Sequence, residues 1–125
     1  MSKALKTLFL VHAVVGIVAG ALLLIIPGRF LEWLHWGANI DPIASRILGA
    51  ALLALAWSSL FGWRATRRSQ VAVLIQMETI FTVLACVGML RHMYRGDWVP
   101  AAWVMLGLFA AFAIAWSFFL VVRRE

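Results

Sequence analysis

Four long apolar runs alternate with short polar stretches along this sequence. Each run has the roughly 20 predominantly apolar residues that an α-helix needs to cross a bilayer. Asp41 is a candidate N-cap for the second run, and Pro42 and Pro100 suit the first turns of the second and fourth. The pattern predicts an all-α integral membrane protein, with residues 1–125 forming a single domain that is a four-transmembrane-helix bundle. The expected spanning helices cover about residues 4–26, 42–63, 69–90 and 99–122.

The longest connection, between the first two runs, has a helical pattern of its own. Arg29, Glu32 and His35 recur every three residues and share one helical side, while the larger apolar side chains between them fall on the other. Trp33 and Trp36 suit the headgroup region, where a ring is half apolar and half wet. We expect a short amphipathic interfacial helix over about residues 29–36 on the outer surface. It either anchors the first hairpin or acts as a lid or partner-docking site.

Composition supports lipid as the solvent of these helices. The chain has 125 residues, of which 65% are hydrophobic and 13% charged, and its mean hydropathy is +0.98. A soluble domain is usually about 45–50% apolar and needs more charge to cover its surface. The net charge of +6 comes from residues dispersed to the ends of the runs, so we expect no nucleic-acid partner. Cys86 is the only cysteine, which excludes an intrachain disulfide.

The basic residues in the short connections indicate an orientation. With both termini inside, the inner side holds Lys3, Lys6, Arg64, Arg67, Arg68, Arg123 and Arg124. The outer side then holds Arg29, Arg46, Arg91 and Arg95. Because basic residues concentrate on the inner side of membranes, this distribution favours a multi-pass protein with its N-terminus and C-terminus both inside.

Glu78 is the acidic residue that should lie at bilayer depth, where a charge costs roughly 2.5–3.5 kcal/mol on insertion scales. Each helix rises about 1.5 Å per residue, so residues equally far from the inner ends lie at similar height. This count predicts one polar layer in the inner half of the bilayer, to which all four helices contribute. Its members are His12, Ser58, Ser59, Gln76, Glu78, Thr79 and Ser117.

Small residues indicate which helix faces pack. His12, Gly16 and Gly20 share one stripe, and Gly16-x-x-x-Gly20 is a pattern that lets helices approach closely. On this pattern His12 lies on a packing face. A similar stripe on the second helix runs through Arg46, Ala50, Ala54 and Ser58.

We hypothesise that Glu78 and His12 are neighbours, with a hydroxyl group from Ser58 or Ser117 completing the hydrogen bonds. Three roles stay open for this intramembrane polar cluster: a clasp that fixes which helices pack together, a proton or ion site, and a ligand or quinone pocket.

A second candidate lies near the outer ends of the helices. Arg46 is about one turn inside the outer end of the second helix, and Asp41 and Arg91 are at comparable height. Arg46 suits a snorkelling anchor or a clamp to an outer acid, with an anionic-substrate or lipid-headgroup site as the alternative. Four tryptophans are expected to anchor the helices at the outer interface: Trp33, Trp36, Trp98 and Trp103.

The sequence offers no recognisable catalytic constellation. His35 and His92 are outer and His12 is inner, so a pair of haem-ligating histidines at one depth is not available. Metal ligands at suitable spacing are also lacking. We therefore expect no catalytic residues, no metal and no resident cofactor, with a quinone or a lipid as the open alternatives.

Short motifs carry a family resemblance. Pro27-Gly-Arg-Phe-Leu31, then Asp41-Pro-Ile-Ala-Ser-Arg46-Ile-Leu-Gly49, resembles small prokaryotic four-helix membrane proteins of the DoxX-like kind, and Trp103-Val-Met-Leu-Gly-Leu-Phe109 is similar too. The resemblance implies a four-helix bundle in a prokaryotic cytoplasmic (inner) membrane. Some relatives are associated with quinone-linked redox complexes. Arg46 is carried over as a matching position, without a role.

Three functions follow as expectations. The first is a non-catalytic accessory or scaffold subunit of a larger membrane assembly, or a self-associating bundle. The alternative is a small oligomeric proton-coupled transporter or channel that uses Glu78 and His12. The third is a quinone- or lipid-binding redox accessory protein. The expected partners are the lipid bilayer and other membrane subunits or further copies of the chain.

Overall fold

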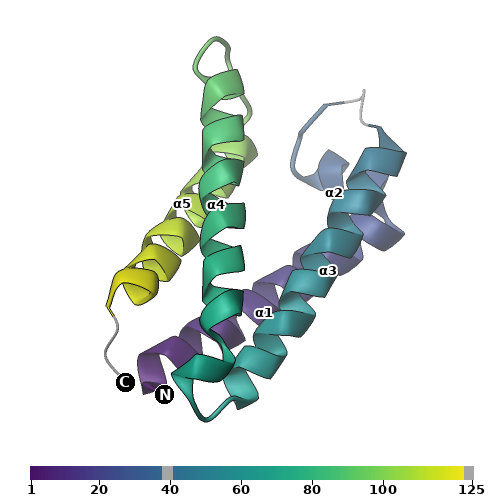
Figure 1. Cartoon of the computed structure of the whole chain (residues 1–125). Coiled ribbons are helices and arrows are strands. Elements are labelled where there is room, and N and C mark those ends of the chain that lie inside the picture. The colour runs from purple at the N-terminus through teal and green to yellow at the C-terminus, as the bar shows by residue number, and fades with distance from the viewer. Residues whose placement is uncertain (38–40, 123–125) are drawn as a thin grey trace. The chain divides into compact units, whose positions relative to one another are not determined.

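The computed structural model describes residues 1–37 and 41–122, and it is built from α-helices joined by short connections (Figure 1). The chain divides into two compact units: an N-terminal unit of Ser2–Arg64, and a C-terminal unit of Ala65–Glu125 to which Met1 also belongs. Each unit contributes two helices that are long and apolar enough to cross a membrane. These are α1 (Lys3–Ile25), α3 (Pro42–Arg64), α4 (Ala72–Met93) and α5 (Pro100–Val121). The predicted all-α membrane class and its four spans are confirmed.

Polar side chains start both spans of the N-terminal unit. The Ser2 hydroxyl group accepts a hydrogen bond from the Leu5 N–H at 3.3 Å, at the beginning of α1. An Asp41 carboxylate oxygen accepts from the N–H groups of Ile43 at 2.9 Å and Ala44 at 3.4 Å. These contacts satisfy N–H groups that a helix start otherwise leaves without a partner in the helix. Asp41 is therefore the N-cap residue that its position before Pro42 predicted.

Glycines bring α1 and α3 into backbone contact. A Cβ atom added at Gly20 would lie 2.9 Å from the Gly49 carbonyl oxygen, and one added at Gly49 would lie 2.7 Å from the Leu24 nitrogen. At Gly16 an added Cβ would lie 2.9 Å from the Cβ of Ala56. Real Cβ atoms essentially never approach so closely, so these positions have no room for a side chain. The predicted packing face through His12, Gly16 and Gly20 is confirmed.

The packing stripe of α3 differs from the predicted one. Its buried residues are Gly49, Ala56, Ser59 and Gly62. Arg46, Ala50 and Ala54 are exposed, so the stripe predicted through them was wrong. The physical reason is the fit to α1: the two glycines of α1 meet Gly49 and Ala56, which are seven residues, or about two turns, apart on α3. The spacing of small residues within α3 did not reveal this partner choice.

The short helix α2 (Pro27–Trp33) packs within the N-terminal unit through Pro27 and Leu31. It begins with Pro27 at its first position, earlier than predicted, because proline there lacks only an N–H that would have no helical partner. It also ends earlier, because His35 takes a left-handed backbone conformation with φ of 54°. Trp36 therefore lies outside the helix, although its backbone N–H group still donates to the Leu31 carbonyl oxygen at 3.0 Å.

The C-terminal unit begins with the 3₁₀ turn η1 (Arg68–Gln70). The Gln70 side-chain oxygen accepts from the N–H groups of Thr66 and Arg67, both at 3.1 Å. This turn occupies the residues where the third span was predicted to start, so α4 begins at Ala72 instead. The helices α4 and α5 then pack as a hairpin, in which the rings of Phe81 and Phe109 meet edge to face at 5.9 Å.

Candidate functional site

A buried hydrogen bond joins the two spans of the N-terminal unit. The Nδ1 atom of His12 on α1 lies 2.9 Å from the Oγ atom of Ser59 on α3. The Ser59 side chain is fully buried and His12 is 6% exposed. Because an unsatisfied polar group in hydrocarbon costs several kcal/mol, this bond allows both side chains to lie in the interface between α1 and α3.

The hydroxyl group that bonds His12 is not the one expected. Ser58 or Ser117 was predicted to complete the hydrogen bonds of the His12 and Glu78 pair, but the Ser58 hydroxyl group donates to the Leu55 carbonyl oxygen of its own helix at 2.7 Å. Neighbouring residues on a helix point about 100° apart, so only one of the two serines can face α1. The packing of Gly16 against Ala56 turns Ser59 toward His12.

The polar residues of α4 form a second local group. Glu78 is fully buried, and the Thr82 hydroxyl group donates to the Glu78 backbone carbonyl at 2.7 Å. The Thr79 hydroxyl group donates to the Ile75 carbonyl, also at 2.7 Å. A threonine inside an apolar helix can satisfy its hydroxyl group through such a bond to the preceding turn of the same helix.

Two further members of the predicted layer lie differently. Gln76 is exposed, so it does not share the buried face of Glu78. Ser117 on α5 is half-buried and lines an apolar hollow of about 540 Å³ together with residues such as Val83 and Ile114.

His12 belongs to the N-terminal unit and Glu78 to the C-terminal unit, so the pairing of these two residues stays a prediction.

The outer-side candidates also divide between the units. Asp41 and Arg46 are exposed residues of the N-terminal unit, and Asp41 has the capping role described above. Arg91 is an exposed residue in the last turn of α4.

Among the predicted tryptophan anchors, Trp33 is 62% exposed and Trp103 is 48% exposed, as suits rings that meet lipid or headgroups. Trp36 and Trp98 are half-buried.

Sequence reasoning missed the role of Arg68. Its guanidinium group donates to the carbonyl oxygens of Val122, at 2.7 Å, and Phe119. It therefore caps the C-terminal end of α5, where carbonyl groups lack helical partners and a positive charge is favourable. The basic character of Arg68 was visible in the sequence, but its partner lies 51 residues further along the chain. Its charge was therefore read as an orientation signal and a possible contact to anionic lipid, and the cap was missed.

No protein-family model, curated protein or solved structure matches this chain. Within residues 1–37 and 41–122, no group of three or more His, Cys, Asp or Glu side chains is placed to hold a metal ion. The fold and the intramembrane polar residues together define the class: a small, helical, multi-pass membrane protein.

Proposed function

We propose that this chain is a non-catalytic accessory or scaffold subunit of a larger membrane assembly. The observation that carries the proposal is the buried hydrogen bond between His12 and Ser59. A histidine in the membrane is a natural candidate for proton or ligand chemistry. Here it bonds α1 to α3, next to glycines that bring the backbones of these two helices close together.

The outward faces of the helices support the same proposal. Each span presents large exposed apolar side chains, exemplified by Val18 on α1, Ile47 on α3, Leu84 on α4 and Ile114 on α5. In a membrane such faces meet lipid or other helices. Association between helices in lipid depends on close packing and polar contacts, which a small protein made almost wholly of spans can offer to a partner.

The test is purification of the tagged full chain from its native membrane in a mild detergent. We expect at least one other membrane protein, or further copies of the chain, to be retained in a fixed ratio. Glu78→Gln should leave that association in place. A chain that elutes alone under conditions that keep other membrane complexes intact contradicts the proposal.

A second candidate function is a small proton-coupled transporter that uses Glu78 and His12. The full burial of Glu78 within an apolar span favours it, because ionisable residues at such depth often lie on proton or ion paths. Reconstitution into vesicles distinguishes the two candidates. Proton flux driven by a pH gradient, present in the natural chain and lost in Glu78→Gln, supports transport and argues against a purely structural role.

We further propose a prokaryotic cytoplasmic membrane as the location, with both termini inside, and relationship to the DoxX-like proteins. The resemblance described above supports the location, and the basic residues around Arg64 and Arg67 support the orientation. Two residues of the orientation count, Arg123 and Arg124, lie outside the described residues. Cysteine accessibility at each connection in intact cells tests the orientation.

A further inference from the structure

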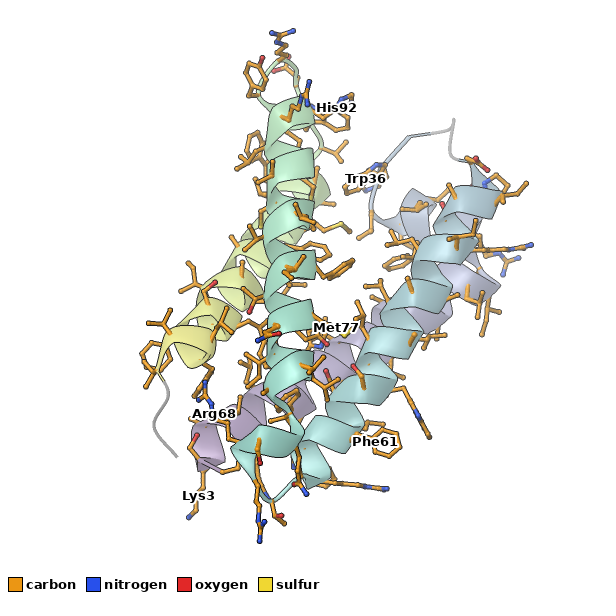
Figure 2. The ribbon with its side chains drawn as sticks, viewed as in Figure 1. Lys3, Trp36, Phe61, Arg68, Met77 and His92 are labelled. Atoms are coloured by element: carbon orange, nitrogen blue, oxygen red, sulfur yellow. The ribbon has the colours of Figure 1, made fainter. Side chains whose placement is uncertain are left out.

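A hollow of about 410 Å³ lies at the turn between α4 and α5. It is lined by Arg91, His92, Arg95, Gly96, Asp97 and Trp98. Figure 2 labels His92 at the end of α4, beside this turn. Because the turn joins the ends of two candidate spans, it comes to lie at a membrane surface when both helices cross the bilayer.

Positive charge predominates in this hollow. Arg91 and Arg95 face it against a single acidic residue, Asp97. The two arginines are four residues apart: Arg91 lies in the last turn of α4, and Arg95 follows the end of that helix at Met93. Arginine presents a planar fork of N–H donors that matches the oxygens of a phosphate group, often through two parallel hydrogen bonds. The side chains at this turn therefore suit a phosphate better than a carboxamide or a cation.

Aromatic contacts hold the turn in shape. The rings of His92 and Trp98 lie 5.1 Å apart between centroids, which ties the end of α4 to the residues just before α5. The Arg95 guanidinium carbon lies 5.0 Å from the centre of the Tyr94 ring, a cation–π distance that restricts this side chain. A site whose groups are already restrained loses less entropy when a ligand binds.

We propose that this hollow binds a phosphate-bearing anion through Arg91 and Arg95. Its volume falls in the range of about 300–1,000 Å³ that is usual for small-molecule sites, so it has room for a phosphate and the group esterified to it. The same chemistry is offered by the headgroup of an anionic phospholipid and by a soluble phosphate. The half-buried Trp98 suits the headgroup level of a membrane.

The experiment measures binding to the full chain in detergent with two probes, short-chain phosphatidylglycerol and inorganic phosphate. The double variant Arg91→Gln/Arg95→Gln should weaken the binding of at least one of these two probes by about tenfold or more, because charge-assisted hydrogen bonds to the phosphate group are lost. The matched control is Arg64→Gln/Arg67→Gln. It removes the same charge from two exposed arginines outside the hollow, and it should change the affinity by less than about twofold.

Asp97→Asn tests the proposal in the opposite direction, since removal of the single acid should tighten binding in a way that misfolding cannot imitate. Loss of phosphatidylglycerol binding alone in the Arg91 and Arg95 variant identifies a lipid headgroup, and loss of inorganic phosphate binding identifies a soluble ligand. Either result supports the site. Equal weakening by both double variants, or unchanged binding in Arg91→Gln/Arg95→Gln, overturns it.

Discussion

The Nδ1 atom of His12 and the Oγ atom of Ser59 lie 2.9 Å apart in the buried interface between α1 and α3. The glycine contacts bring the two helix backbones close, and this hydrogen bond fixes which side chains meet. A polar contact inside an otherwise apolar pair of helices favours one arrangement, because a rotation or sliding of either helix breaks that contact.

Ser59→Ala should lower the free energy of unfolding by about 1 kcal/mol. Hydrogen bonds between helices in membranes average about 0.6 kcal/mol, and the buried His12 ring also loses this bond without gaining contact with water. Ser58→Ala is the matched control, because the Ser58 hydroxyl group donates its hydrogen bond to the Leu55 carbonyl oxygen of the same helix. Equilibrium unfolding in mixed micelles measures both variants. Equal losses would show that His12 gains nothing particular from Ser59.

Gly49→Ala should destabilise the protein by about 1–3 kcal/mol, the usual effect of overpacking. The added Cβ would lie 2.7 Å from the Leu24 nitrogen and 2.8 Å from the Gly20 carbonyl oxygen, and backbone atoms cannot move aside as a side chain can. Gly88→Ala is the control in α4, where the added Cβ would have no neighbour within 4 Å beyond the local helix backbone and the adjoining residues. It should be neutral or stabilising by up to about 1 kcal/mol through helix propensity. Denaturation in the same micelles compares them, and a neutral Gly49→Ala would contradict the close approach of α1 and α3.

Arg68→Gln should loosen the last turn of α5, because it removes the charge that bonds the Phe119 and Val122 carbonyl groups. Hydrogen exchange in this turn should become several-fold faster, consistent with a loss of about 1 kcal/mol for such partly exposed bonds. Arg67→Gln, at the neighbouring exposed residue, should leave the exchange unchanged. Similar exchange rates in the two variants would show that the cap contributes little.

Asp41→Ala should lower stability by about 1 kcal/mol through loss of the N-cap of α3, whereas Asp41→Asn should retain most of it. Thermal unfolding followed by circular dichroism in detergent measures the two. If alanine and asparagine behave alike, the N–H groups of Ile43 and Ala44 are satisfied by water and the cap is unimportant.

The sequence was sufficient to predict the elements whose cause is local. Long apolar runs predicted the four spans, and Asp41 before Pro42 predicted the start of α3. The boundary errors arose where a single side chain or backbone angle decides: Gln70 builds the turn before α4, and His35 ends α2 early. Neither effect leaves a periodic signal.

The level at which His12 meets α3 was predictable, but the serine that faces it was not. Counting residues from the helix ends placed His12 level with both Ser58 and Ser59, since one residue changes the height by only about 1.5 Å. Which serine faces α1 depends on the glycine contacts at Gly16 and Gly49, which involve both helices at once. The same limit explains why Arg46 was placed on a packing stripe although it is exposed.

Native mass spectrometry of the tagged chain released from its own membrane can show whether the chain is a subunit of a membrane assembly. We expect a complex of defined mass that contains the chain with other subunits or further copies of itself, and the same mass for Glu78→Gln. A mass that corresponds to one chain with bound lipid alone, together with proton flux in vesicles that depends on Glu78, would contradict it.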